Sequence, residues 1–172
     1  FINYNNKPRL HRCMLVDELF RTKLNEFGRI SSNKLTTVRP DNVSDLLGIY
    51  TYEFKCWKEE YINIDSYGDS EKIYTDEYSP LLTRPNALIE LVSETSKEVA
   101  FITEKTFRPI LLEQPFICLG APNQNLDLLK YGFELYDEIF DYSFDSQPNI
   151  EDRINGIIEN LLLIFLVIAR VL

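Results

Sequence analysis

Two groups of residues combine cationic and hydrogen-bonding side chains at close spacing. The first occupies residues 5–12 and contains four such side chains, Lys7, Arg9, His11 and Arg12. The second is the run Thr-Glu-Lys at residues 103–105. Basic side chains at the amino end of a helix favour binding of a phosphate or pyrophosphate. In the second group, the Lys can neutralise a phosphate and the Glu can accept hydrogen bonds from ribose hydroxyls, so both groups suit a nucleotide.

Each group also has an ordinary structural interpretation. The first could be a solvated basic loop, and the second a capped helix whose Glu lies favourably in its first turn. An acidic cluster further along could hold Mg²⁺, although such a run is more often a solvated face: Asp137, Glu138, Asp141 and Asp145. Cys118, inside an apolar run, is expected to be a small core residue.

Composition narrows the classes of function. Lys and Arg total 18 and Asp and Glu total 27 in 172 residues, a net charge of −9. This balance disfavours a domain that grips nucleic acid backbone or an anionic membrane surface. With His11 as the one histidine and three cysteines without a CxxC motif, triad catalysis, zinc sites and a disulfide framework lose support. No GxGxxG or Walker motif occurs, and reduced thiols favour a cytoplasmic protein.

The hydrophobic patterns predict alternating strands and helices. Strands are expected at residues 1–4, 29–31, 87–92, 116–119 and 133–136, and helices at 13–24, 103–112 and 126–131. This order predicts an α/β fold with a Rossmann-like parallel sheet and helices on both faces. Ligands of such sheets bind beyond the carboxyl ends of the strands, where both polar groups fall.

The domain is expected to span residues 1–148, with an irregular insertion near 32–85, and a C-terminal apolar helix at 149–172. Within the insertion, residues 43–57 fit one helix face, while alternation from Tyr50 to Cys56 fits a strand, and both interpretations stay open. The uninterrupted apolar run near the C-terminus is too short to span a bilayer. It is expected to be a buried or oligomer-facing helix end, which allows a homodimer.

Glu94 is followed seven residues later by Phe-Ile-Thr-Glu-Lys at 101–105, and this spacing resembles the donor-binding motif of α-1,3-fucosyltransferases. Asn6, Arg12 and the helix after them resemble that family's asparagine-containing loop, phosphate-binding arginine and first helix. Residues 115–122, a strand followed by Gly-Ala-Pro, resemble the strand and Gly-x-Pro turn that follow the motif. The run from Thr103 to Pro109 is also similar to small glycosyltransferase-like proteins of phages and marine microbes.

The resemblance implies the nucleotide-sugar-binding half of a GT-B glycosyltransferase. By position, Arg12 and Lys105 would bind the donor diphosphate and Glu104 would hold the ribose hydroxyls. Glu94 would be the catalytic residue, either facing the sugar or stabilising positive charge that develops at the anomeric carbon. The residues expected to bind the donor are Asn6, Arg9, Arg12, Thr95, Phe101, Thr103, Glu104 and Lys105. A GDP-sugar is favoured over a UDP-sugar, and catalysis would need no metal or other cofactor.

Two departures from the family leave the sugar open, because Thr95 replaces a common Asn and Phe101 a frequent Tyr. The chain is also short for two GT-B domains of about 100–150 residues each, so the acceptor domain is expected to be absent and the acceptor is unknown. The alternative hypothesis is a non-catalytic α/β interaction module that oligomerises through its apolar C-terminal helix.

Overall fold

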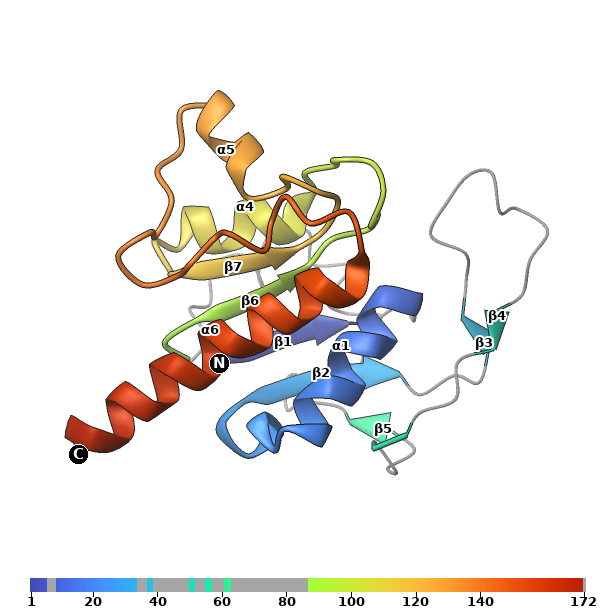
Figure 1. The fold of residues 1–172 in the computed structure, drawn as a ribbon. Helices are drawn as coiled ribbons and strands as arrows, with labels where there is room; N and C mark the ends of the chain where they lie inside the picture. Colours follow the sequence, from blue (N-terminus) through green and yellow to red (C-terminus); the bar gives the residue numbers. More distant parts are fainter. Residues whose placement is uncertain are drawn as a thin grey trace.

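Four parallel strands, with a fifth antiparallel strand at one edge, form the sheet on which the rest of the structure is built (Figure 1). The computed structural model describes residues 1–5, 9–33, 37–38, 50–51, 55–56, 61–62 and 87–171. The strand order is β5-β2-β1-β6-β7. The strands are β1 (Ile2–Asn5), β2 (Arg29–Asn33), β5 (Tyr61–Ile62), β6 (Glu90–Ser93) and β7 (Phe116–Leu119).

β1 lies where the strand order reverses. It pairs in parallel with β2 on one side, with Asn3 opposite Ile30, and with β6 on the other, with Ile2 opposite Glu90. β7 continues the parallel pairing beyond β6, and β5 runs antiparallel to β2. In a doubly wound sheet, the crevice for ligands opens at the carboxyl ends of the two strands that flank such a reversal. Here these strands are β1 and β6.

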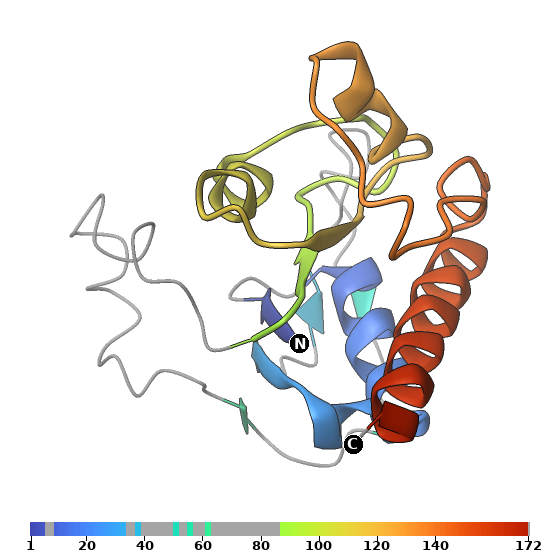
Figure 2. The same ribbon diagram turned by 90° about the vertical axis from the view of Figure 1, so that its left-hand side faces the viewer.

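Helices cover both faces of the sheet (Figure 2). One face carries α1 (Leu10–Arg21), followed by a 3₁₀ turn at Leu24–Phe27, and the long α6 (Ile150–Val171). The other carries α4 (Glu104–Leu111) and α5 (Leu126–Lys130). The predicted α/β fold, with a Rossmann-like parallel sheet and helices on both faces, is therefore confirmed.

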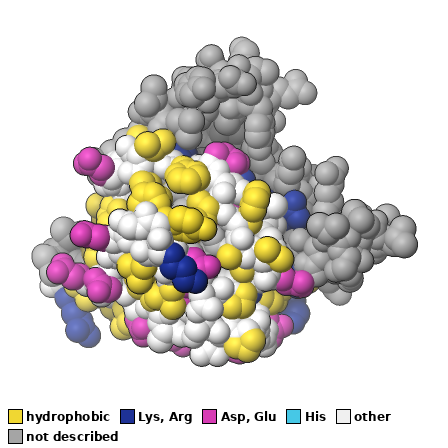
Figure 3. All heavy atoms as spheres, turned by 90° about the horizontal axis from the view of Figure 1, so that it is seen from above, with side chains coloured by type: hydrophobic (Ala, Val, Ile, Leu, Met, Phe, Trp, Pro, Cys, Tyr) yellow, Lys and Arg dark blue, Asp and Glu magenta, His cyan; other side chains and the backbone are white. Residues whose placement is uncertain are grey.

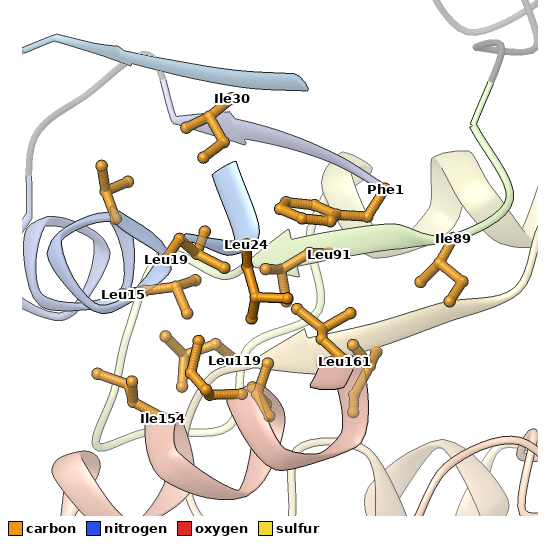
Figure 4. Close-up of a cluster of buried hydrophobic side chains, with 14 of the residues drawn as sticks. Phe1, Leu15, Leu19, Leu24, Ile30, Ile89, Leu91, Leu119, Ile154 and Leu161 are labelled. Atoms are coloured by element: carbon orange, nitrogen blue, oxygen red, sulfur yellow. The ribbon is translucent and has the colours of Figure 1, made fainter. Parts of the chain in front are cut away.

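The larger core lies between the sheet and the pair α1 and α6 (Figure 4). Alternate strand residues such as Leu91 and Leu119 point toward Leu15 and Leu19 of α1 and Ile154 of α6. Burying a side chain of this size contributes about 1.5–3 kcal/mol relative to leaving it exposed, and this packing fixes both helices to the sheet.

Glycines allow two aromatic rings to approach the backbone in this core. A Cβ on Gly28 would lie 2.3 Å from the ring of Phe1, and a Cβ on Gly156 would lie 2.2 Å from Cβ of Phe144. Either distance is far inside van der Waals contact. Gly156 is thus the position at which α6 packs closely against the segment that precedes it.

A smaller apolar cluster fills the opposite face. Val92, Phe116, Cys118 and Leu128 form its buried centre. The side-chain amide of Asn125 pairs with both main-chain groups of Cys118: Cys118 N–H donates to Oδ1 at 2.9 Å, and Nδ2 donates to the Cys118 carbonyl at 2.8 Å. The predicted role of Cys118 as a core residue is confirmed, and burial raises the pKa of its thiol well above the ordinary value.

α6 is buried along its first half and exposed along its second. Ile157 and Leu161 are fully buried, whereas Leu163, Leu166 and Val167 are each more than half exposed. The C-terminal end of the helix extends past the amino ends of β1 and β6 (Figure 1). Among the described residues, no helix is long and apolar enough to cross a membrane. The pairing of two chains through this helix stays a prediction.

Most predicted elements are present, with one exception. The strand expected at residues 133–136 is wrong, because Phe133, Leu135 and Tyr136 pack their side chains over the smaller cluster while the backbone pairs with no strand. Instead, the Tyr136 hydroxyl donates to the Gln114 carbonyl at 3.3 Å. The helix and strand alternatives for residues 43–57 lie largely outside the described residues. Within this range the structure describes β4 (Tyr50–Thr51), which pairs with β3 (Thr37–Val38).

Candidate functional site

The start of α1 contacts the carboxyl end of β6. Nη2 of Arg12 donates to the main-chain carbonyls of Ser93 at 3.0 Å and Glu94 at 2.9 Å. Nε2 of His11 lies 2.9 Å from the same Glu94 oxygen. A carbonyl oxygen only accepts, so Nε2 carries the proton in this contact. Both side chains are buried, and together they attach α1 to the end of the strand across the sheet reversal.

The Glu94 carboxylate is fully buried at the start of α4. Oε1 accepts from the main-chain N–H of Thr103 at 3.0 Å and from the Thr106 hydroxyl at 2.5 Å. Oε2 accepts from the Thr103 hydroxyl at 2.8 Å and from the N–H of Thr95 at 3.1 Å. A helix begins with N–H groups that have no partner within the helix, and a carboxylate there is favourable. Glu94 therefore fixes where α4 begins.

Thr103 is the N-cap of α4. Its backbone is extended, and its hydroxyl oxygen accepts from the main-chain N–H of Lys105 at 3.3 Å. The helix contains Pro109, which removes a main-chain donor two residues before its end. The Thr-Glu-Lys run thus occupies the N-cap and first turn of a helix directed at the crevice.

Lys105 and Glu104 form an ion pair in the first turn of α4. Nζ of Lys105 lies 2.7 Å from Oε1 of Glu104 and 3.4 Å from the Thr103 hydroxyl. Partial burial alone would raise the pKa of Glu104, but the hydrogen bond and charge of Lys105 and the helix start outweigh it and lower that pKa. Both side chains retain contact with solvent, so they are accessible to a ligand.

Two buried side chains from distant elements hold the loop between Glu94 and Thr103. Nη2 of Arg153, on α6, donates to the Lys97 carbonyl at 2.8 Å. Gln124 accepts from the N–H of Phe101 at 3.3 Å and donates to its carbonyl at 3.4 Å. Both main-chain polar groups of Phe101, its N–H and its carbonyl, are therefore hydrogen-bonded to Gln124. The residue itself is 55% exposed. The loop is anchored on three sides by Glu94, Arg153 and Gln124.

Polar side chains also line the strands beneath the crevice. Nδ2 of Asn3 donates to the Leu91 carbonyl at 2.5 Å and to the Ser93 hydroxyl at 3.3 Å. Asn5 donates its amide hydrogen to Oδ1 of Asn3. All three side chains are buried, so β1 and β6 are tied together by amide contacts at the same end where Arg12 binds.

The structure brings four of the predicted site residues into one chain of contacts. Arg12 binds the Glu94 carbonyl, the Glu94 carboxylate binds Thr103, and Thr103 contacts Lys105. Arg9 is half-buried and forms the N-cap of α1. The main-chain N–H of Thr95 donates to the Glu94 carboxylate. Asn6 lies outside the described residues. The Glu94 carboxylate is buried and binds the start of α4. The catalytic and donor-binding roles themselves stay predictions.

The sequence reasoning missed Asn3, Arg153 and Gln124. One signal for Arg153 was present, because it lies four residues before Ile157 and so falls on the apolar face of its helix. Asn3 sits in a run expected to be a strand, where a polar residue in the interior signals a buried hydrogen bond. No local pattern marks Gln124, whose partner Phe101 lies 23 residues away.

The acidic cluster of residues 137–145 is divided between buried and exposed positions. Asp145 is buried and accepts from the N–H groups of Asn125 and Leu126, both at 2.9 Å. Asp141 instead closes its own turn by accepting from Ser143. In the described part of the chain, no three metal-ligating side chains gather. The chain matches no protein-family model, no curated protein and no solved structure.

Proposed function

We propose that this chain is the donor-binding domain of a fucosyltransferase-like glycosyltransferase, which binds a nucleoside-diphosphate sugar for transfer to an acceptor. The resemblance of residues 94–105 to the fucosyltransferase motif supports the donor class. The position of those residues, at the carboxyl ends of β1 and β6, supports a ligand site, since this is where doubly wound sheets bind nucleotides. A GDP-sugar is the first donor to test, by the same resemblance.

One observation carries the proposal: the helix starts of α1 and α4 meet at a single residue, Glu94. Its carbonyl binds Arg12 from α1 and its carboxylate binds Thr103 and Thr106 at α4. The two helix starts thereby bring the cationic side chains of Arg12 and Lys105 toward one end of the sheet, in a chain of net charge −9. A diphosphate is the ligand group that best fits such a place.

The proposed roles follow from accessibility. Lys105, partly exposed beside the helix start, would pair with a diphosphate oxygen and exchange its contact with Glu104 for it. Glu104, 70% exposed, would then accept hydrogen bonds from ribose hydroxyls. Because its carboxylate is buried, Glu94 would act as a positioning residue that sets the place of Thr103 and Lys105. The leaving diphosphate would be stabilised by cationic side chains without a metal.

Titration calorimetry of GDP, with UDP and ADP as comparison ligands, tests the proposal. Lys105→Ala is expected to weaken binding of the preferred nucleotide by about 1.5–3 kcal/mol, the usual scale for a hydrogen bond to a charged group. Lys130→Ala is the matched control, because Lys130 also pairs with a neighbouring carboxylate, at 2.5 Å from Asp127, but lies on α5. It should leave affinity unchanged.

Arg12 is buried, so its removal affects stability as well as binding. Arg12→Lys keeps the charge but loses the planar guanidinium, whose Nη2 donates to the carbonyls of both Ser93 and Glu94. It is expected to weaken nucleotide binding while the chain stays folded by circular dichroism. If none of the three nucleotides binds to the folded wild type at millimolar concentration, the proposed function is wrong.

A further inference from the structure

A groove separate from the crevice lies between α5, residues 135–143 and α6. Its volume is about 670 Å³. Apolar side chains from all three segments line it, with Leu129 on α5, Ile139 in the intervening segment and Leu163 on α6. None of the residues that line it belongs to the proposed donor site. We refer to it as the α5–α6 groove.

The wall of the α5–α6 groove is held in place before any partner arrives. The amide of Asn160 on α6 accepts from the Asp141 N–H at 2.7 Å and donates to the Asp141 carbonyl at 2.9 Å. The ring of Tyr142 packs against those of Phe140 and Phe144. A preformed wall lowers the ordering cost of binding, because the groove need not be built by its ligand.

The apolar surface continues beyond the groove along α6. Leu129 is 52% exposed and Leu163 is 61% exposed, and Leu166 and Val167 follow one helical turn later. Seen from above, hydrophobic side chains are spread over this end of the molecule, with most carboxylates toward its outline and one Lys or Arg side chain near its centre (Figure 3). An exposed apolar strip with a polar rim is typical of a protein–protein contact.

The rim charge identifies the kind of partner. Asp137, Glu138 and Asp141 line the groove, and no Lys, Arg or His is among the described residues that line it. Lys130 lies on the adjacent helix, but it is paired with Asp127. An acidic rim opposes an anionic membrane surface, and it opposes a second copy placed face to face, because the same carboxylates would then meet. It attracts a cationic partner.

We propose that the α5–α6 groove binds a basic amphipathic helix of a partner protein. Apolar residues of that helix, spaced three and four positions apart, would pack on Leu129, Ile139 and Leu163. Its Lys or Arg residues would face Asp137, Glu138 and Asp141 at the rim. This surface is independent of nucleotide binding, so each proposal stands or fails by its own measurement.

Fluorescence polarisation with designed peptides tests the proposal on the full chain. The probe is a labelled amphipathic helix of Leu and Lys, compared with a scrambled peptide of the same composition and with a Leu and Glu peptide of the same pattern. The wild type should bind the amphipathic Leu and Lys peptide at least about tenfold more tightly than either comparison peptide. Added salt should weaken this binding.

Three variants locate the contact. Leu163→Glu, at an exposed position, should reduce affinity about tenfold or more by placing a charge on the apolar floor. Asp137→Asn combined with Glu138→Gln should reduce it about threefold to tenfold at low salt. Glu98→Gln combined with Glu113→Gln removes the same charge from exposed positions that do not line the groove, and should leave affinity unchanged.

Three results would overturn the proposal. Equal binding of the scrambled peptide would show attraction by net charge alone. Equal affinity of the groove variants and the control would place the contact elsewhere. A wild-type dimer in sedimentation velocity that Leu163→Glu dissociates, without added peptide, would assign this surface to a second copy of the chain.

Discussion

Nη2 of Arg12 donates to the carbonyl oxygen of Glu94 at 2.9 Å, across the point where the strand order of the sheet reverses. The same residue, Glu94, uses its carboxylate to hold the start of α4. One residue therefore sets the spacing of the two helix starts at the crevice. Changes at Glu94 are expected to act on structure first and on ligand binding through it.

Glu94→Gln tests this role. The substitution removes a charge that accepts four hydrogen bonds and turns part of the group into a donor facing other donors. The free energy of unfolding is expected to fall by about 2–4 kcal/mol. Urea denaturation followed by circular dichroism measures it. Glu98→Gln, an exposed carboxylate of the same loop, should change stability by less than about 0.5 kcal/mol, and a similar loss in both variants would contradict the assignment.

Arg153→Met is expected to lower the free energy of unfolding by about 2–4 kcal/mol. Arg153 is buried and donates to the carbonyls of Gln147, Pro148 and Lys97, which would lose their partner while the methionine fills part of the space. Arg21→Met removes an exposed arginine paired with Glu18, and its cost should stay below about 0.5 kcal/mol. Hydrogen exchange should also quicken at residues 97–101 in Arg153→Met, and unchanged exchange there would argue against the anchoring role.

Gly156→Ala should destabilise the protein, although alanine ordinarily favours a helix by about 1 kcal/mol over glycine. The reason is steric, because the new Cβ would lie 2.2 Å from Cβ of Phe144. A net loss of about 1–3 kcal/mol in thermal or urea unfolding is expected. Phe144→Ala removes the ring but keeps its Cβ, so the double variant should show only partial relief in a double-mutant cycle. A stabilising Gly156→Ala would show that α6 and Phe144 are further apart.

The stability of the protein should depend on pH through Asp145. Burial raises the pKa of this carboxyl, and the hydrogen bonds from Leu126 and Asn125 offset only part of the effect. At pH values between the ordinary pKa and the raised pKa, Asp145 is therefore protonated in the native state and ionised in the unfolded chain. This contribution to stability is present below the ordinary pKa and is lost as pH rises through the raised value.

Urea unfolding of the wild type and Asp145→Asn between about pH 3 and pH 7 measures the effect. The wild type should lose stability relative to the variant as pH rises, by at most about 1.4 kcal/mol per pH unit. Asp152→Asn, on the exposed side of α6, controls for the loss of one negative charge. A wild type that gains stability over Asp145→Asn across this range would contradict the sign of the shift.

Local patterns predicted the elements that bury a continuous apolar run. The runs at residues 87–92 and 116–119 are hydrophobic on both faces, which identifies strands inside a covered parallel sheet, and Thr103 carries an N-cap signal. Residues 133–136 have the same apolar character, yet they form no strand. Their side chains pack over the smaller apolar cluster. This placement depends on the contact between the rings of Tyr136 and Phe116, which the hydrophobic pattern of residues 133–136 does not indicate.

The candidate site was predictable only in its positions along the chain. Arg12, Glu94 and Lys105 could be selected because their residue types and spacing suit a nucleotide site. The orientation of their side chains could not be predicted. Arg12 binds a main-chain carbonyl 82 positions away, and Arg153 binds one 56 positions away. Main-chain acceptors have no signature in the sequence, and contacts with them depend on how the sheet brings distant segments together.

Among the described strands, β7 lies at the edge of the sheet, where unpaired main-chain groups can recruit a strand from another molecule. Asn125 occupies that edge at Cys118 with one donor and one acceptor, and Asp145 holds Asn125 in turn through a 2.7 Å hydrogen bond. A single side chain thus takes the place of the next strand. The pair Asn125 and Asp145 thereby occupies the main-chain groups of Cys118 that a strand from another molecule would otherwise need.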